Sequence, residues 1–185
     1  MPTRADLIAA LAAHEPFDAH EAAMRERILE FVRAYAECFE RSLLIGHVTA
    51  SAWVVDPALS MSLLTHHAKL GRWLQPGGHC DGDPDVLANA LREVREEVGI
   101  KRLKPLLDGR IFDVDAHGIP ARGSEPAHVH YDIRFLVEAD PREPLEMTEE
   151  SRELAWAPLD GIPALNTDES VLRLAAKTRL LAGLR

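Results

Sequence analysis

The segment Gly78–Ile100 reads GHCDGDPDVLANALREVREEVGI, and it joins an acidic loop to a helix that Gly99 closes. A helix turns by about 100° per residue, which gathers apolar residues on one side of the segment: Leu87, Leu91, Val94 and Val98. Glu93, Glu96 and Glu97 fall together on the opposite side. The segment therefore predicts a helix with one buried apolar side and an acidic ridge, formed by these three glutamates.

The acidic ridge calls for an explanation because like charges three or four residues apart on a helix repel one another. A counter-ion would remove this repulsion, and carboxylate oxygens are the hard ligands that suit Mg²⁺ or Mn²⁺. The other interpretation is a solvated helix face, which is common in glutamate-rich helices. The charges by themselves leave both interpretations open.

The regions on either side of this helix predict a mixed β-sheet with further helices around it. Residues 1–45 are expected to be helical, and Asp18 with Glu21 resembles a capping box for the second helix. Asn166 is expected to cap the last helix. The β-rich runs lie at residues 47–56, 59–65, 73–75, 103–115, 128–138 and 153–157. The expected fold class is therefore α+β, with an N-terminal helical extension (1–45) and one main domain (46–185).

The composition excludes several classes of protein. The chain has 185 residues, 21 of them Lys or Arg and 30 Asp or Glu, and its net charge of −9 argues against binding a nucleic-acid backbone. Two cysteines, Cys38 and Cys80, cannot build a disulfide framework and favour a reducing compartment. No signal peptide is recognised, and no stretch approaches the ~20 apolar residues of a membrane span. We expect a cytoplasmic protein with no membrane or nucleic-acid partner.

The helix and its loop also resemble the signature box of the Nudix hydrolases, the MutT-like family. That box is a Gly followed, after a gap, by Arg-Glu-apolar-x-Glu-Glu-x-Gly-apolar. The residues that match it are Gly78, Arg92, Glu93, Val94, Glu96, Glu97, Gly99 and Ile100. One position departs, because Pro84 stands where the family usually has Glu. The nearby acids Asp81, Asp83 and Asp85 are candidate substitutes.

The resemblance covers roughly residues 46–160 and implies a Nudix α/β/α sandwich that hydrolyses a diphosphate linked to another group. It implies Mg²⁺ or Mn²⁺ bound by the acidic ridge, with the Gly77 carbonyl as a further ligand. The implied catalytic residues are Glu93, Glu97 and Arg92, where Arg92 orients Glu93 or Glu96. The general base stays open between Glu93 and Glu97, and the later acids Glu149, Glu150 and Glu153 are alternatives.

Two basic residues, Lys69 and Arg72, precede the Gly-Gly turn and are candidate phosphate ligands. The alternative for both is an ordinary surface charge. The expected partner of the protein is a small-molecule diphosphate. A homodimer is also expected, from the habit of the family and from the apolar side of the second predicted helix.

The histidines form a second pattern. His128, His130 and Asp132 alternate in HVHYD, so a strand would place all three on one face. With His47 and His79, the two strand histidines resemble in position the metal ligands of type-1 isopentenyl-diphosphate isomerases, which share the Nudix fold. This resemblance implies a second metal site at His47, His79, His128 and His130, with Asp132 as a further ligand or orienting group.

Imidazole ligands favour Zn²⁺, Fe²⁺ or Mn²⁺ over Mg²⁺ at such a site. The alternative is that these histidines bind substrate phosphates or satisfy buried hydrogen bonds. The sequence carries no comparable signal at His14, His20 or His117.

The predicted function is divalent-metal-dependent hydrolysis of a phosphoanhydride bond in a nucleoside diphosphate linked to another moiety, the reaction of a Nudix pyrophosphatase. The first alternative is a Nudix domain that binds a nucleotide as a sensor with little hydrolysis, which Pro84 would permit. The second is an isomerase-like enzyme. That family needs a reactive Cys directly before the Gly-His pair, where this chain has Gly77.

Overall fold

The computed structural model describes residues 1–123, 125–149 and 151–183. Its helices are α1 (Arg4–Ala13), α2 (Ala19–Ala34), α3 (Val86–Val98) and α4 (Glu169–Gly183), with short 3₁₀ turns at Leu107–Gly109 and Ile162–Ala164. Its strands are β1 (Gly46–Val55), β2 (Met61–His67), β3 (Trp73–Leu74), β4 (Gly77–His79), β5 (Lys104–Pro105), β6 (Ile111–Ile119), β7 (His128–Glu138) and β8 (Ser151–Pro158).

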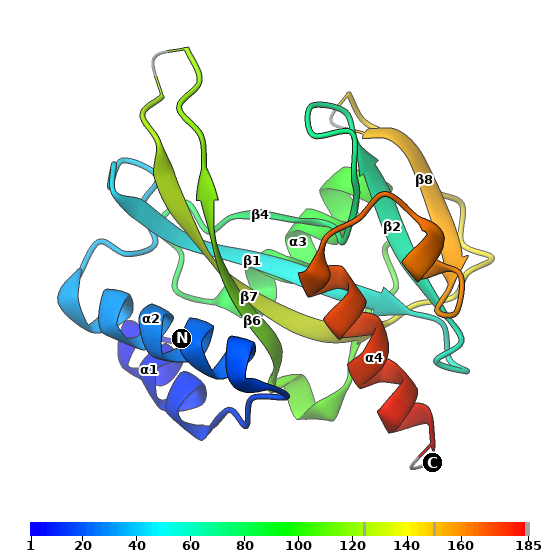
Figure 1. Ribbon diagram of the computed structural model, residues 1–185, viewed down its shortest axis with the longest axis horizontal. Coiled ribbons are helices and arrows are strands. Elements are labelled where there is room, and N and C mark those ends of the chain that lie inside the picture. Colours follow the sequence, from blue (N-terminus) through cyan, green and yellow to red (C-terminus); the bar gives the residue numbers. More distant parts are fainter. Residues whose placement is uncertain (124, 150, 184–185) are drawn as a thin grey trace.

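The strands form one mixed sheet around β1 and β7. These two strands are neighbours in parallel orientation along the whole of β1, from Gly46 opposite Val129 to Val55 opposite Glu138. The strand order is β3-β2-β1-β7-β5, while β4 pairs with β1, β6 with β7 and β8 with β2. Figure 1 shows the β6–β7 hairpin and the β2–β8 pair rising on either side of the sheet centre.

Helices cover both faces of the sheet because side chains alternate along β1. Val48, Ala50, Ala52 and Val54 pack in one core with residues of α1, α2 and α3. Trp53 and Val55 belong to a second core with Val171 and Leu174 of α4. Figure 1 shows α3 behind the central strands and α4 in front of them. The arrangement confirms the predicted α+β sandwich with a mixed sheet.

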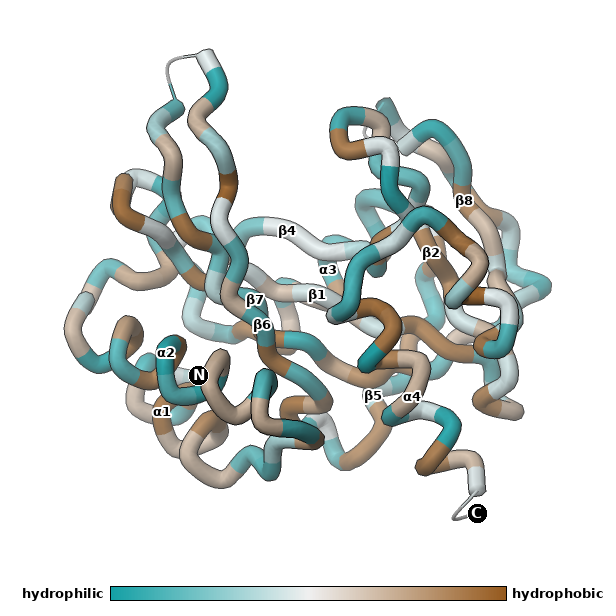
Figure 2. The backbone as a smooth tube through the Cα atoms, viewed as in Figure 1, coloured by the Kyte–Doolittle hydropathy of each residue, from teal (hydrophilic) through white to brown (hydrophobic). Residues whose placement is uncertain are grey.

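The N-terminal helices are part of this packing. Leu11, Ile28 and Val32 are fully buried in the same core as Val48 of the sheet. Figure 2 shows hydrophilic and hydrophobic residues interspersed along α1 and α2, as expected for helices with one buried side. Residues 1–45 thus cover one face of the sheet, and the boundary at residue 46 stays a prediction.

Glu21 has a different role from the one its position predicts. Asp18 does cap α2, because its side chain accepts the Glu21 N–H. The Glu21 carboxylate turns inward and accepts hydrogen bonds from the Phe17 N–H and from Lys177 Nζ of α4. It also lies 2.8 Å from His14 Nε2. Glu21 therefore ties α2 to α4 across the buried interior instead of completing a capping box.

The buried position of Glu21 predicts acid sensitivity. Burial by itself would raise the pKa of Glu21, but hydrogen bonds with His14 and Lys177 outweigh it and lower the pKa from 4.5 to about 2. A carboxylate with a lowered folded-state pKa stabilises the fold above pH 4.5, and this contribution is lost as the pH falls toward 2. We expect Glu21→Gln to cost about 3 kcal/mol at pH 7.

The measurement is urea unfolding of wild type and Glu21→Gln at pH 7 and at pH 3. The difference in urea midpoint between wild type and Glu21→Gln should be smaller at pH 3 than at pH 7. Glu26→Gln, on the exposed side of α2, is the control and should match wild type. A difference that is equal at both pH values would show that Glu21 does not titrate as argued.

The helix that the acidic segment predicts is present as α3. Asp85 caps it by accepting the Ala88 N–H, and Gly99 ends it with a φ of 80°. Two local expectations are wrong. His79 lies in β4 and not in the loop, and Asp168 caps α4, while the Asn166 side chain donates to the Gly71 carbonyl. Among the described residues, no helix is long and apolar enough to cross a membrane.

Candidate functional site

The strand β4 brings backbone groups against the acidic ridge. The Gly77 N–H donates to Glu97 Oε2 at 3.1 Å. At Gly78, a Cβ atom would lie 2.6 Å from the Glu93 carboxylate, so a side chain cannot fit there without moving Glu93. The close approach of α3 therefore requires a glycine at position 78, while Gly77 presents its backbone N–H to Glu97.

Side chains on the two faces of β4 would meet different groups. A Cβ on Gly77 would clash with Ser51 at 2.2 Å, whereas one on Gly78 would meet Glu93. By alternation His79 extends to the same face as Gly77. Thus β4 separates the acidic ridge on one side from the polar face of β1 on the other.

Arg92 positions the acidic ridge. Its guanidinium contacts Glu93 Oε1 and Glu96 Oε2, each at 2.8 Å, and it donates to the His79 carbonyl at 2.8 Å. Burial lowers the pKa of Arg92, but Glu93 and Glu96 outweigh this effect and hold it above its usual value. The geometry agrees with an orienting role for Arg92. It also connects β4 to the ridge through His79.

The remaining predicted site residues differ in their exposure and position. Of the two glutamates that contact Arg92, Glu96 is the more exposed: 59% of its side chain is accessible, against 13% for Glu93. Lys69 and Arg72 are exposed in the β2–β3 turn. Within the described ranges, neither forms an ion pair with the ridge. Glu149 and Glu153 lie at the start of β8 or just before it, and Glu150 is outside the described residues.

The loop around Pro84 is organised by its own acids. Asp85 caps α3, and Asp83 accepts the Asp85 N–H at 2.9 Å. The Asn89 side chain donates to the carbonyls of Asp83 and Asp85. Asp81 lies 3.9 Å from Arg41. Of the proposed substitutes for the missing glutamate, Asp83 and Asp85 thus serve the start of the helix.

The histidine cluster (His47, His79, His128 and His130) forms as the sequence predicts. His47 of β1 lies opposite His130 of β7, and His79 of β4 lies opposite Thr49. Nitrogen atoms of His47, His79 and His130 all lie within 4.8 Å of one another. His128 Nε2 is 3.2 Å from His130 Nε2. Three strands that are distant in sequence thus bring four imidazoles together.

Burial and neighbouring groups lower the pKa of three rings of the cluster, His47, His79 and His130, and so favour their neutral form. Burial lowers the pKa of His79 to about 4, with Arg41 and His47 acting in the same direction. Burial, then His79 and His47, lower the pKa of His130 to about 2. Burial and His128 also lower the pKa of His47. Neutral imidazoles offer lone pairs instead of positive charge, which disfavours the alternative of phosphate binding by these histidines.

His117 is a member of the neighbourhood that the sequence did not reveal. It lies opposite His130 on β6, and the two ring centroids are 5.7 Å apart. The expected strand ended at residue 115 and so left out His117, whereas β6 continues to Ile119. The alternation of Asp113, Asp115 and His117 along one face was the available signal.

Asp132 does not serve the histidines as the sequence suggested. Its carboxylate accepts from Thr49 Oγ1 at 3.0 Å, from Ser51 Oγ at 2.8 Å and from Arg134 Nε at 2.7 Å. Arg134 is fully buried and also contacts Asp113 and Asp115. Asp132 thus belongs to a buried charge network below the histidine cluster, and its lone pairs are used there.

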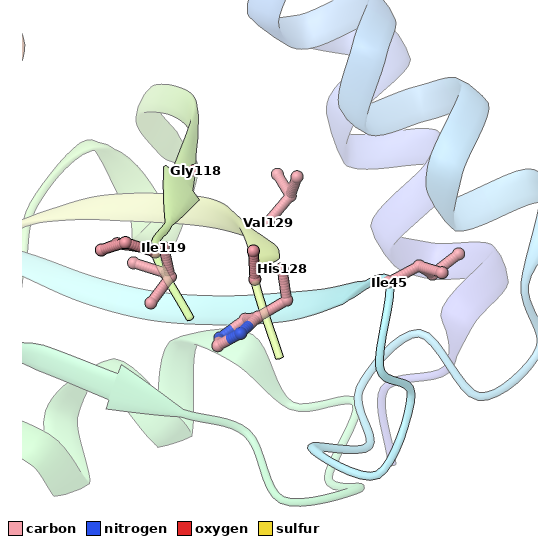
Figure 3. Close-up of a pocket in the computed structure, with 7 residues that line it drawn as sticks. Ile45, Gly118, Ile119, His128 and Val129 are labelled. Carbon is pink, nitrogen blue, oxygen red and sulfur yellow. The ribbon is translucent and has the colours of Figure 1, made fainter. Parts of the chain in front are cut away.

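A shallow hollow of about 460 Å³ borders the cluster at the base of the β6–β7 hairpin. Its lining is largely apolar and includes Ile45, Ile119, Val129 and His128. Figure 3 shows the His128 and Val129 side chains leaving β7 in opposite directions, as strand alternation requires. The His128 ring therefore points away from the face that Val129 covers.

Comparison with known proteins supports the fold. No match is found among curated protein sequences. A solved structure of a C. elegans Ap4A hydrolase binary complex is 20% identical, covers 74% of this chain and 98% of that chain, and has a TM-score of 0.58. The E. coli dihydroneopterin triphosphate pyrophosphohydrolase is 16% identical over 69% of this chain and 90% of that chain, with a TM-score of 0.55.

A third similar structure is the NUDIX domain of Shewanella oneidensis NrtR complexed with ADP ribose, which is 18% identical over 81% of this chain and 95% of that chain, with a TM-score of 0.51. At these identities the likeness shows a shared fold. The sequence model described as the NUDIX domain matches residues 46–175, which is more than half of the chain. The match spans β4, α3 and every strand of the sheet, and the chain belongs to the Nudix family.

Proposed function

We propose that this protein hydrolyses a phosphoanhydride bond in a nucleoside diphosphate linked to another moiety. The observation that carries the proposal is the apposition of the ridge and the Gly-Gly strand, where Gly77 donates to Glu97 and Gly78 leaves room only for Glu93. Carboxylates held against backbone amides in this way are oriented before any ligand binds. A glutamate on a solvated helix face would not lie close enough to require a glycine at position 78.

A divalent metal fits this donor set, and Nudix hydrolases generally use one. Arg92 can neutralise at most one of the three negative charges of the ridge, so a cation is electrostatically favoured there. Glu93, Glu96 and Glu97, with the Gly77 carbonyl, are the oxygen donors that would hold Mg²⁺ or Mn²⁺. When bound, the ion would neutralise the diphosphate and lower the pKa of a nearby water.

Residues of the chain would orient the carboxylates, take a proton from water and contact the substrate phosphates. Arg92 holds the carboxylates of Glu93 and Glu96 in place. The Gly77 N–H fixes Glu97 Oε2, so that the Glu97 carboxylate is positioned to take the proton of the attacking water. Glu93 is the alternative base. Lys69 and Arg72 stay proposed contacts for the phosphates of the substrate. They would meet a substrate that enters beside the β2–β3 turn.

Two other functions are less well supported. Isomerase chemistry needs a reactive cysteine beside His79, but burial raises the pKa of the Cys80 thiol far above neutral pH, and Asp132 acts in the same direction. A nucleotide sensor is favoured by one position, Pro84, which stands where the family usually has Glu. The cytoplasmic location and the homodimer expected from the sequence stay predictions.

The test is a panel of nucleoside diphosphate sugars, dinucleoside polyphosphates and nucleoside triphosphates, each assayed with Mg²⁺ and with Mn²⁺. Product release is followed by chromatography, and binding is measured separately by calorimetry. Metal-dependent turnover of at least one class is the expected result. Tight binding of a nucleotide with no turnover of any compound would favour the sensor and contradict the hydrolase.

The close approach at Gly78 gives a sharper prediction. Gly78→Ala should displace the Glu93 carboxylate, because the new Cβ would lie 2.6 Å from it. A displacement of about 1 Å in a catalytic group can cost on the order of 10²-fold in rate, and we expect a loss of that size in kcat. Gly118→Ala is the matched control, since a Cβ there meets no atom within 4 Å among the described residues. Equal activity of the two variants would contradict the proposed role of Glu93.

A further inference from the structure

We propose that the histidine cluster binds one divalent transition-metal ion of the Zn²⁺ type, at a site separate from the acidic ridge. The site would use His47 of β1, His79 of β4 and His130 of β7, with His128 as a fourth ligand. It lies on the opposite face of β4 from Glu93. The proposal does not depend on hydrolytic activity and goes beyond the proposed function.

The spacing of the ring nitrogens suits one ion. Two imidazole ligands on tetrahedral Zn²⁺, at a Zn–N distance of about 2.0–2.1 Å, place their nitrogens about 3.3 Å apart. The Nε2 atoms of His128 and His130 are 3.2 Å apart. One nitrogen each of His47, His79 and His130 lies within 4.8 Å of the others, and His128 joins this group through His130, so the rings would move inward to reach the spacing of one ion.

The tautomer of His128 directs a lone pair into the cluster. Its Nδ1 lies 2.9 Å from the Pro126 carbonyl, and a carbonyl only accepts hydrogen bonds, so Nδ1 must carry the proton. In the neutral ring, Nε2 of His128 is then the nitrogen with the lone pair, and it lies 3.2 Å from His130 Nε2. A histidine whose outer nitrogen donates to a backbone carbonyl while its inner nitrogen presents a lone pair has the usual arrangement of a metal ligand.

Hydrogen bonding within the protein does not account for the whole cluster. The His128–His130 contact could be a hydrogen bond, but it would leave His47 and His79 unexplained. Among the described residues, neither ring nitrogen of His47 nor Nε2 of His79 has a hydrogen-bond partner. The Leu43 carbonyl lies close enough to His47 to raise its pKa slightly, yet outside normal hydrogen-bond geometry.

This lack of partners has an energetic cost that a ligand would remove. His47 is 2% exposed, and a buried polar group without a partner costs about 1–3 kcal/mol. A bound ion would satisfy the inward nitrogens of several rings at once. A single water molecule has only two protons to donate, so it would not satisfy all of these lone pairs.

The donor chemistry selects the class of ion. The cluster offers nitrogen donors, and the nearest buried carboxylate on its strand face, Asp132, is engaged by Thr49, Ser51 and Arg134. Neutral imidazoles favour Zn²⁺ and its first-row neighbours, whereas Mg²⁺ prefers oxygen. The two sites would therefore select different ions, with Mg²⁺ or Mn²⁺ at the ridge and a Zn²⁺-type ion at the histidines.

The experiment uses the full chain without a polyhistidine tag. The protein is stripped with a chelator, and Co²⁺ is titrated in as a spectroscopic substitute for Zn²⁺. We expect one equivalent to bind with visible absorption typical of nitrogen coordination, and Zn²⁺ to displace it. Zn²⁺ should also raise the thermal midpoint, because an ion that binds the folded state stabilises it.

Variants locate the ion and provide controls. His79→Asn and His130→Asn should each weaken binding at least roughly 10–100-fold, the loss seen even for groups that only support a ligand. His66→Asn removes a histidine of β2 that stacks on Trp73 and should bind like wild type. Glu97→Gln should also retain the ion, which distinguishes the cluster from the ridge.

The outcomes are distinct from those of the hydrolase test, because metal binding and not turnover is measured. Absence of a stoichiometric Co²⁺ or Zn²⁺ complex in wild type would overturn the proposal whatever the variants do. Binding that survives in folded His79→Asn and His130→Asn, or that disappears in Glu97→Gln, would also overturn it. Folding of each variant is checked by circular dichroism.

Discussion

Glu97→Gln is expected to lower kcat by about 10²–10⁴-fold with whichever substrate the panel identifies. The substitution keeps the size of the side chain, and the amide oxygen can still accept the Gly77 N–H that now bonds to Glu97 Oε2. It removes the basic carboxylate oxygen that a general base requires and the negative charge that strengthens binding of a divalent cation. The fold should be preserved while the chemistry is lost.

Three measurements make this prediction specific. The rate is determined with saturating Mg²⁺ and with saturating Mn²⁺, since simple loss of metal affinity would be partly rescued by more metal. Glu30→Gln changes an exposed glutamate of α2 in the same way and should retain full activity. If Glu97→Gln keeps more than about a tenth of the wild-type rate, Glu97 is not the base and Glu93 takes its place in the proposal.

Arg134→Met is expected to destabilise the fold by about 3–5 kcal/mol, the usual cost of removing one partner from a buried ion pair. Arg134 lies 2.7 Å from Asp132, 3.3 Å from Asp113 and 3.4 Å from Asp115. Its side chain is 2% exposed, so water cannot replace the lost contacts. For a chain of this length the thermal midpoint should fall by roughly 6–20 °C.

The control is Arg142→Met, because Arg142 pairs with Asp140 while 88% of its side chain is exposed. That pair is screened by solvent, and little change in midpoint is expected. Burial raises the pKa of Asp115, but His117 and Arg134 outweigh it and hold that pKa well below its usual value, so the loss of thermal midpoint in Arg134→Met should be smaller at low pH, where Asp115 takes up a proton. Equal midpoints for the two variants at pH 7 would contradict the role assigned to the buried network.

The alternation of β4 gives the protein two chemically different faces within three residues. Gly78 opens toward Glu93, whereas Gly77 and His79 face β1. Arg92 connects β4 with the acidic ridge, because it contacts Glu93 and also the His79 carbonyl.

Local patterns were sufficient for much of this molecule. The spacing of Leu87, Val94 and Val98 predicted α3, and Gly99 predicted its end, since helix periodicity and capping depend on residues close in sequence. The spacing of Gly78, Arg92 and Glu97 led to the family, which the match over residues 46–175 confirms. The alternation in HVHYD also predicted correctly which residues of β7 share a face.

Local patterns fail where the partner of a residue is distant in the chain. Glu21 carries the signal of a capping box, yet its carboxylate contacts Lys177, and no local rule anticipates a partner 156 residues away. Asp132 was expected beside the histidines but is held by Thr49 and Ser51 of another strand. Buried charges seek whichever opposite charge the packing brings near, so only the folded chain identifies it.

The sequence by itself determined the acidic helix, the glycine that ends it and the face that His128, His130 and Asp132 share on their strand. Only the tertiary structure decided that His117, His130 and His47 form a row across β6, β7 and β1. The reason is that alternation within a strand is local, whereas strand order and register depend on contacts between segments far apart in the chain. The same register places Arg134 among three aspartates and leaves His47 buried among other imidazoles.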